Sequence, residues 1–205
     1  MYSFNMVDFF TKGGIFMYPI AICSVISLAI FMERLWNTRR KKIIPDGFTN
    51  KIEIFLNDGK TGEAMGFCEN QASPISRIIY IGIKNRSRGR ETLKAMMEDA
   101  GKKEAVRLFK NVEALSTIAS ISTLLGLLGT ISGMIKIFSV ISQQTVVNPT
   151  TLAGGISEAL NTTAYGLTVA IPTIIFYKYL YSKINVLMLA MEEYSINILE
   201  LIKKD

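Results

Sequence analysis

The sequence predicts an all-α integral membrane protein with three transmembrane helices. Three separate apolar runs are each about as long as the roughly 20 residues that a membrane-spanning helix needs, and a soluble chain seldom contains three of them. The runs lie at 13–32, 118–141 and 152–180. With their flanking residues included, the runs predict spans at 13–36, 111–142 and 152–181. We expect the second and the third helix to be long and to extend into the cytoplasm.

The distribution of charge predicts how these helices are oriented. Basic residues cluster at 39–42 and outnumber acidic residues over 37–110 as a whole, whereas the connection at 143–151 carries no charge. Because positively charged loops stay in the cytoplasm, we expect a cytoplasmic helical segment at 37–110 and a cytoplasmic helical tail at 182–205. An amphipathic segment at 1–12 and the 143–151 turn then lie outside. The net charge of +6 is therefore a topology signal, and no recognition motif supports nucleic-acid binding.

The polar parts of the chain also show helical patterns. Phe48 and Ile52 recur at helical spacing, and Ser73 followed by Pro74 is typical of a helix start. No proline interrupts residues 91–144, so we expect one long helix that begins in the cytoplasm and continues as the second span. The first apolar run fits a retained span better than a signal peptide, because its basic cluster follows the run instead of preceding it.

The third run carries polar residues that lipid does not favour. Glu158 is followed by Asn161, Thr162 and Thr163, and a carboxylate within a span costs roughly 2.5–3.5 kcal/mol on insertion scales. At about 3.6 residues per turn, Glu158 and Thr162 share one face, while Thr163 joins a neighbouring stripe of small residues that includes Gly166. The polar face indicates a pore or a partner. Two plainer interpretations remain: threonines that bond their own backbone, and a Glu158 at the membrane interface.

The second run has a face rich in glycine. Gly126, Gly129 and Gly133 recur at intervals of three and four residues, so they share one face of a helix, and Thr130 lies beside them. Small residues let two helices approach closely. We therefore expect these three glycines, together with Gly166 of the third run, to be helix-packing residues.

The sequence does not predict an enzyme. It contains no histidine, nucleotide-binding loop, serine-nucleophile motif or cluster of metal ligands, so we expect no catalytic residue, cofactor or metal. A proton path instead needs hydroxyls or water, an ionisable relay and a dry wall. Thr130, Thr162, Thr163 and Glu158 can supply such a path. One subunit has too few spans to enclose it, which implies a homo-oligomeric ring.

Several motifs resemble those of the ExbB/TolQ branch of the MotA/TolQ/ExbB proton-channel family. They are ERLW at 33–36, LLGLLGT at 124–130, GGISEAL at 154–160, TTAYGL at 162–167 and AIP at 170–172. With the spacing of the runs and the basic loop, the resemblance extends over nearly the whole chain.

This resemblance implies a homopentamer in the bacterial inner membrane, with a periplasmic N-terminus and a cytoplasmic C-terminus. Its pore would hold the helices of a dimeric, single-span ExbD/TolR-like partner, whose Asp carries the proton. By motif position, Thr130 and Thr163 are similar to pore threonines near that Asp, and Glu158 to a glutamate nearer the outer mouth. The implied function is conversion of the proton motive force into mechanical work, passed to a TonB- or Pal/TolA-like envelope protein.

Two positions depart from the best-known members of the family. Ser132 stands where a Trp is common, and Lys136 places a positive charge near the proposed proton entrance, although its long side chain can also reach the interface. Lys136 leaves open whether the ion is H⁺ or Na⁺. Two other functions remain open as well: a flagellar-stator-like channel subunit, although such proteins usually have four spans, and a non-conducting membrane scaffold, which would not need the polar face.

Overall fold

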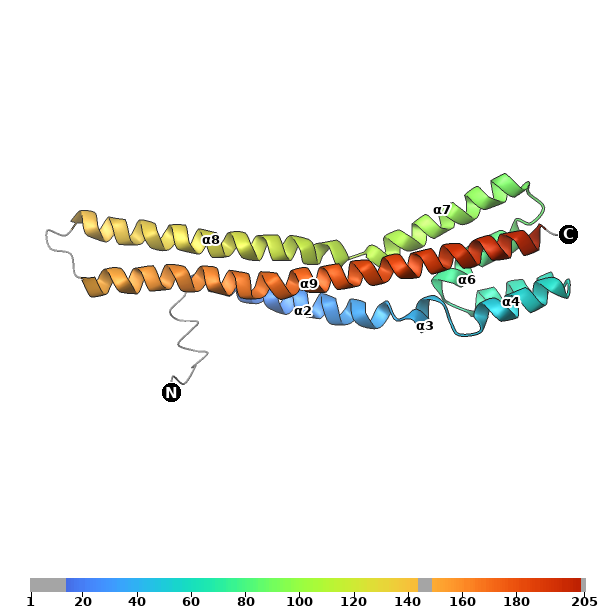
Figure 1. Cartoon of the computed structure of the whole chain (residues 1–205), viewed down its shortest axis with the longest axis horizontal. Helices are drawn as coiled ribbons and strands as arrows, with labels where there is room; N and C mark the ends of the chain where they lie inside the picture. Colours follow the sequence, from blue (N-terminus) through green and yellow to red (C-terminus); the bar gives the residue numbers. More distant parts are fainter. Residues whose placement is uncertain (1–13, 144–148, 204–205) are drawn as a thin grey trace. The chain divides into compact units, whose positions relative to one another are not determined.

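The computed structural model describes residues 14–143 and 149–203, and every regular element within these ranges is a helix (Figure 1). The expected segment at 1–12 and the centre of the expected turn at 143–151 lie outside the described residues. The helices are α2 (Met17–Asn37), α3 (Arg40–Ile43), α4 (Phe48–Asn57), α5 (Thr61–Asn70), α6 (Pro74–Lys84), α7 (Arg90–Phe109), α8 (Val112–Gln143) and α9 (Pro149–Ile202).

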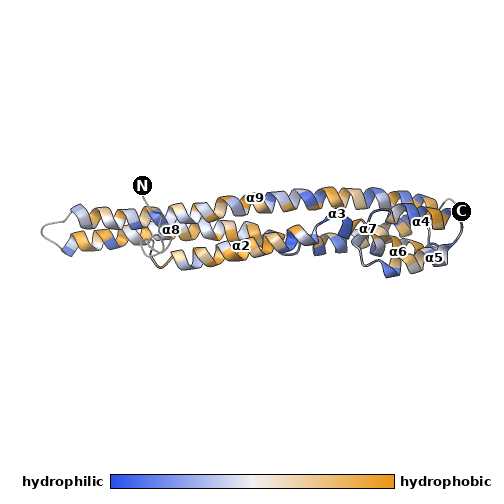
Figure 2. Cartoon of the chain, turned by 90° about the horizontal axis from the view of Figure 1, so that it is seen from below, coloured by the Kyte–Doolittle hydropathy of each residue, from blue (hydrophilic) through white to orange (hydrophobic). Residues whose placement is uncertain are grey.

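The described chain divides into two compact units. The first, here called the span unit, comprises residues 14–32, 111–143 and 149–178, and the second, the polar unit, comprises residues 33–110 and 179–203. Three helical stretches are long and apolar enough to cross a membrane, and α2 is coloured as hydrophobic along most of its length in Figure 2. The expected all-α fold with three apolar spans is confirmed.

One expectation about the second span is wrong. The helix expected to run unbroken through 91–144 is interrupted, because α7 ends at Phe109 and α8 begins only at Val112. Between them Asn111 has a φ of 64°, a left-handed conformation that Asn tolerates better than most residues other than glycine. No glycine or proline marks this site, so the sequence pattern continues across the break.

The third span and the expected tail form a single helix. α9 is 54 residues long and contains Pro172. It begins at Pro149, a residue that is favoured at the first helical position because its missing N–H has no helical partner there. The helix passes from the span unit into the polar unit without interruption. The helix thus begins three residues before the span predicted at 152–181.

The polar unit is built around the apolar face of α6. As the sequence predicts, this helix begins at Pro74, and the Ser73 hydroxyl accepts a hydrogen bond of 3.3 Å from the backbone N–H of Ser76. The isoleucines on its apolar face are buried, as are Phe48 and Ile52 of α4. The buried isoleucines of α6 are Ile75, Ile78, Ile79 and Ile83.

A carboxylate is buried in the polar unit and paired with two arginines. The side chain of Glu104, in α7, is only 5% exposed. Arg77 donates to both of its oxygens, from Nε at 2.8 Å and from Nη2 at 2.6 Å, and Arg107 donates at 2.8 Å. The hydrogen bonds to Glu104 raise the pKa of Arg77 against the opposing effect of burial. This ion pair therefore joins α6 to α7.

We expect Arg77→Leu to destabilise the protein by about 3 kcal/mol, because the buried Glu104 carboxylate loses two of its three donors. Arg107→Leu is the matched control. It removes one donor from a side chain that is 65% exposed, so its cost should stay below about 1 kcal/mol. Thermal unfolding of the purified variants in detergent measures both effects, and equal losses would contradict the assignment of Arg77 as the principal partner.

Candidate ion-path site

The second and third spans approach each other on glycines. In the span unit α8 and α9 run antiparallel and side by side (Figure 1), and residues early in α9 face residues late in α8. A Cβ on Gly166 would lie 2.6 Å from the backbone oxygen of Ser122, and a Cβ on Gly126 would lie 3.2 Å from the Cα of Thr163. Distances of this kind leave no room for a side chain.

The same contact includes the two other glycines that the sequence marks for packing. A Cβ on Gly129 would lie 2.3 Å from the Cγ2 of Thr162, and one on Gly133 would lie 2.7 Å from the Cβ of Ala159. All four predicted packing residues therefore lie at the α8–α9 contact, where the backbones come close enough for side-chain hydroxyls to reach across.

Two hydroxyls, one from each helix, meet at this contact. Thr163 of α9 donates a hydrogen bond of 2.8 Å to the backbone oxygen of Gly126 in α8, and its Oγ1 lies 3.5 Å from the Oγ1 of Thr130. Thr130 donates at 2.6 Å to the backbone oxygen of Leu127. Both threonines are half-buried. The structure thus brings together the two residues whose motif positions imply a pore lining.

Thr162 occupies a different environment from Thr163. It is 1% exposed, its methyl group packs over Gly129, and its hydroxyl donates at 3.0 Å to the backbone oxygen of Glu158. Glu158 and Thr162 share one face of α9. At the level of Thr162 this face is turned toward α8. Thr162 therefore packs the two helices together, with its hydroxyl bonded within its own helix.

Glu158 is bracketed by two other segments of the span unit. Its Oε1 lies 3.6 Å from the Nζ of Lys136 in α8, and the two side chains are 38% and 67% exposed respectively. The same oxygen would lie only 2.7 Å from a Cβ on Gly14, which precedes α2 and has a φ of +71°. Any other residue at this position would be strained and would displace the carboxylate.

The sequence pattern does not predict the pair of Lys136 and Glu158. It places the Lys136 charge near the proposed proton entrance, on a side chain long enough to reach the interface. The register of the glycine contact was the available signal, because Gly133 faces Ala159. In an antiparallel pair of helices, Glu158 then lies level with the residue directly after Gly133, two positions from Lys136, so two long side chains can meet.

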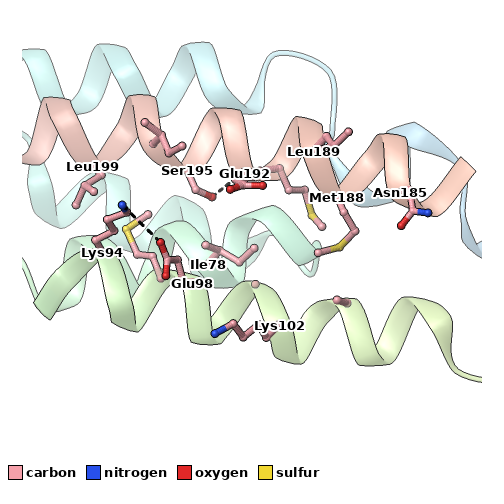
Figure 3. A pocket seen from close by; sticks show the side chains of 15 residues that line it. Ile78, Lys94, Glu98, Lys102, Asn185, Met188, Leu189, Glu192, Ser195 and Leu199 are labelled. Carbon is pink, nitrogen blue, oxygen red and sulfur yellow. Dashed lines mark hydrogen bonds and ion pairs between the residues drawn. The ribbon is translucent and has the colours of Figure 1, made fainter. Parts of the chain in front are cut away.

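The polar unit contains a cavity that is separate from these residues. It has a volume of about 700 Å³ and lies between α7 and α9, with Ile78 of α6 at its wall (Figure 3). Its lining is apolar and rich in methionine, and charged side chains such as Lys94 and Glu98, 3.8 Å apart, surround it. None of the site residues predicted from the sequence lines this cavity, and the described residues contain no group of metal ligands.

The fold and the site define a helical membrane protein whose second and third spans pack on glycines and bring two hydroxyls and an ion pair together. The sequence model of the MotA/TolQ/ExbB proton channel family matches residues 70–193. The chain belongs to this family.

Curated relatives support the same assignment. The chain is 32% identical over 183 residues to the putative biopolymer transport protein ExbB-like 1 of Synechocystis sp., covering 87% of this chain and 71% of that protein. It is 27% identical over 166 residues to biopolymer transport protein exbB1 of Vibrio cholerae, covering 78% and 72%. It is 28% identical over 214 residues to the Tol-Pal system protein TolQ of Haemophilus influenzae, covering 88% and 86%.

Proposed function

We propose that this chain is the ring-forming subunit of a proton-driven motor in a bacterial inner membrane. The observation that carries the proposal is the meeting of the Thr163 and Thr130 hydroxyls, 3.5 Å apart, at the contact between α8 and α9. Both hydroxyls remain partly exposed in the single chain. Each can exchange hydrogen bonds with a proton carrier placed beside it, which a side chain sealed inside the helix pair cannot do.

The proton carrier is a second protein in this proposal. A dimeric, single-span partner of the ExbD/TolR type places an Asp beside Thr163 and Thr130, and the hydroxyls stabilise that side chain as it gains and loses a proton. Each charge that crosses the membrane releases about 2.3 kcal/mol per 100 mV. A few protons therefore supply enough free energy to turn or shift the partner, which passes the motion to a TonB-like or a Pal/TolA-like envelope protein.

Exposed apolar surfaces of the span unit support a ring of identical subunits in this proposal. Large apolar side chains on α8 and α9 are exposed in the single chain, among them Leu124, Ile135, Phe138, Leu160 and Ile171. Lipid or neighbouring subunits must cover such side chains. In the proposed pentamer, α8 and α9 of each subunit line the central pore, the N-terminus is periplasmic and the C-terminus cytoplasmic.

Two measurements on the full chain test this function. Native mass spectrometry of the protein, gently purified from its own membranes, is expected to find five copies with a substoichiometric single-span protein. Reconstitution of that complex into liposomes with a pH-sensitive dye inside is expected to give proton flux driven by a potassium diffusion potential. A monomer that carries no protons would contradict the proposal and would favour a non-conducting scaffold.

A further inference from the structure

Lys136 and Glu158 form an ion pair between the second and third spans. The ammonium Nζ of Lys136 lies 3.6 Å from Oε1 of Glu158. On its other side the same oxygen borders Gly14, the residue that leaves room for it. The carboxylate is therefore held between α8 and the residues that precede α2, and the Lys136 ammonium is paired with it.

A carboxylate at the edge of a membrane needs a positive counter-charge, because leaving it uncompensated in a low-dielectric environment is costly. Two sources can supply that charge: a side chain, or a cation from solution. Rings of acidic side chains attract and hold cations at channel mouths for this reason. In this protein the side chain occupies the position.

We propose that Lys136 is the residue that sets ion specificity at this site. Its ammonium is the built-in counter-ion of Glu158 and keeps small metal cations, Na⁺ in particular, from occupying the carboxylate. A proton is not excluded in the same way, because it attaches to one oxygen and needs no shell of ligands, whereas a hard metal cation needs several oxygen ligands around it. This inference deepens the proposed function and rests on it where it concerns ion flux, but cation binding depends only on the ion pair.

The binding part of the inference is tested by thermal unfolding of the purified full chain. Each variant is unfolded in NaCl and in N-methylglucamine chloride at equal ionic strength, since the organic cation is too large to replace an ammonium between two helices. Wild type is expected to show the same Tm in both salts. The Tm of Lys136→Gln is expected to be about 3 °C higher in NaCl than in N-methylglucamine chloride. Mass action gives a shift of this size for a ligand present at about ten times its Kd in a chain of this length.

Two further variants separate a bound ion from a general salt effect. Lys136→Arg keeps a cation beside Glu158 and is expected to restore a Tm that does not depend on Na⁺. The double variant Lys136→Gln with Glu158→Gln removes the carboxylate and is expected to lose the sodium effect again. No sodium effect in Lys136→Gln, a sodium effect in wild type, or its persistence in the double variant would each overturn the inference.

The functional part is read in the same liposomes that test the proposed function. Proton flux through wild type is expected to be equal in the two salts, and flux through Lys136→Gln is expected to fall several-fold in NaCl. If no variant carries protons, the proposed function fails, and the Tm values still decide whether Lys136 keeps Na⁺ away from Glu158. If protons flow and the Tm pattern is absent, the function stands and this inference fails.

Discussion

Thr163→Val is expected to reduce proton flux by about two orders of magnitude or to background, while the protein still folds and assembles. Valine has nearly the shape of threonine but no hydroxyl, so the group that meets Thr130 across the α8–α9 contact is lost. Positioned groups that assist proton transfer contribute about 100-fold to 10,000-fold in rate. The hydrogen bond of 2.8 Å to Gly126 is lost as well, at about 0.6 kcal/mol, the average for such bonds between membrane helices.

Two other variants make this test specific. Thr168→Val is the matched control, because Thr168 lies in the same helix, is exposed and donates only to its own helix, at 2.8 Å to the backbone oxygen of Ala164. Its flux should equal that of wild type. Thr163→Ser keeps the hydroxyl and should recover most of the flux. Normal flux in Thr163→Val, with the complex intact by native mass spectrometry, would remove Thr163 from the ion path.

Gly166→Val is expected to be the most destabilising substitution in the span unit. Its first added carbon would lie 2.6 Å from the backbone oxygen of Ser122 and 3.0 Å from the Cα of Gly126. Neither atom belongs to a side chain that can rotate away, so α8 and α9 must separate. Overpacking typically costs about 1–3 kcal/mol, and we expect about 3 kcal/mol here, which lowers Tm by about 10 °C in a chain of this length.

Gly154→Ala provides the comparison. Gly154 also lies in α9, but no atom other than those of its neighbours and its own helix lies within 4 Å of the position that a Cβ would take. Alanine is a better helix former than glycine by about 1 kcal/mol, so this variant should unfold at the same or a slightly higher temperature. Equal losses of stability in the two variants would show that glycine matters here only through backbone freedom, and not through the close contact.

The helical fold was largely predictable because its causes are local in the sequence. A run of apolar residues is itself the physical reason for a span, and Pro74 after a capping serine is itself a reason for a helix start. The glycines of the second and third runs predicted the packing face because small residues at helical spacing are themselves what lets two helices approach closely. The break at Asn111 was not predictable in this way, because an Asn in the left-handed conformation leaves no mark on apolar periodicity.

The site was predictable only in part, because it depends on how two helices are registered. Reading α9 alone put Thr162 and Glu158 on one polar face, and only the partner helix reveals that Thr162 is covered by Gly129. The pair of Lys136 and Glu158 likewise requires the antiparallel register of α8 against α9. Residues that share a helix can be grouped from the sequence, whereas residues that meet across helices need the register as well.

The unbroken course of α9 has a mechanical consequence. Its 54 residues give a rod about 81 Å long at about 1.5 Å per residue, whereas the hydrocarbon core of a bilayer is about 30 Å thick. A rod of this length that crosses close to the membrane normal has more than half of its length outside the hydrocarbon. An axial displacement or a twist applied at one end of α9 reaches the other through a helical backbone whose hydrogen-bond ladder lacks the N–H of Pro172. The same displacement applied to α8 reaches α7 only through the break at Lys110 and Asn111, so α9 is a stiffer connection than the one between α8 and α7.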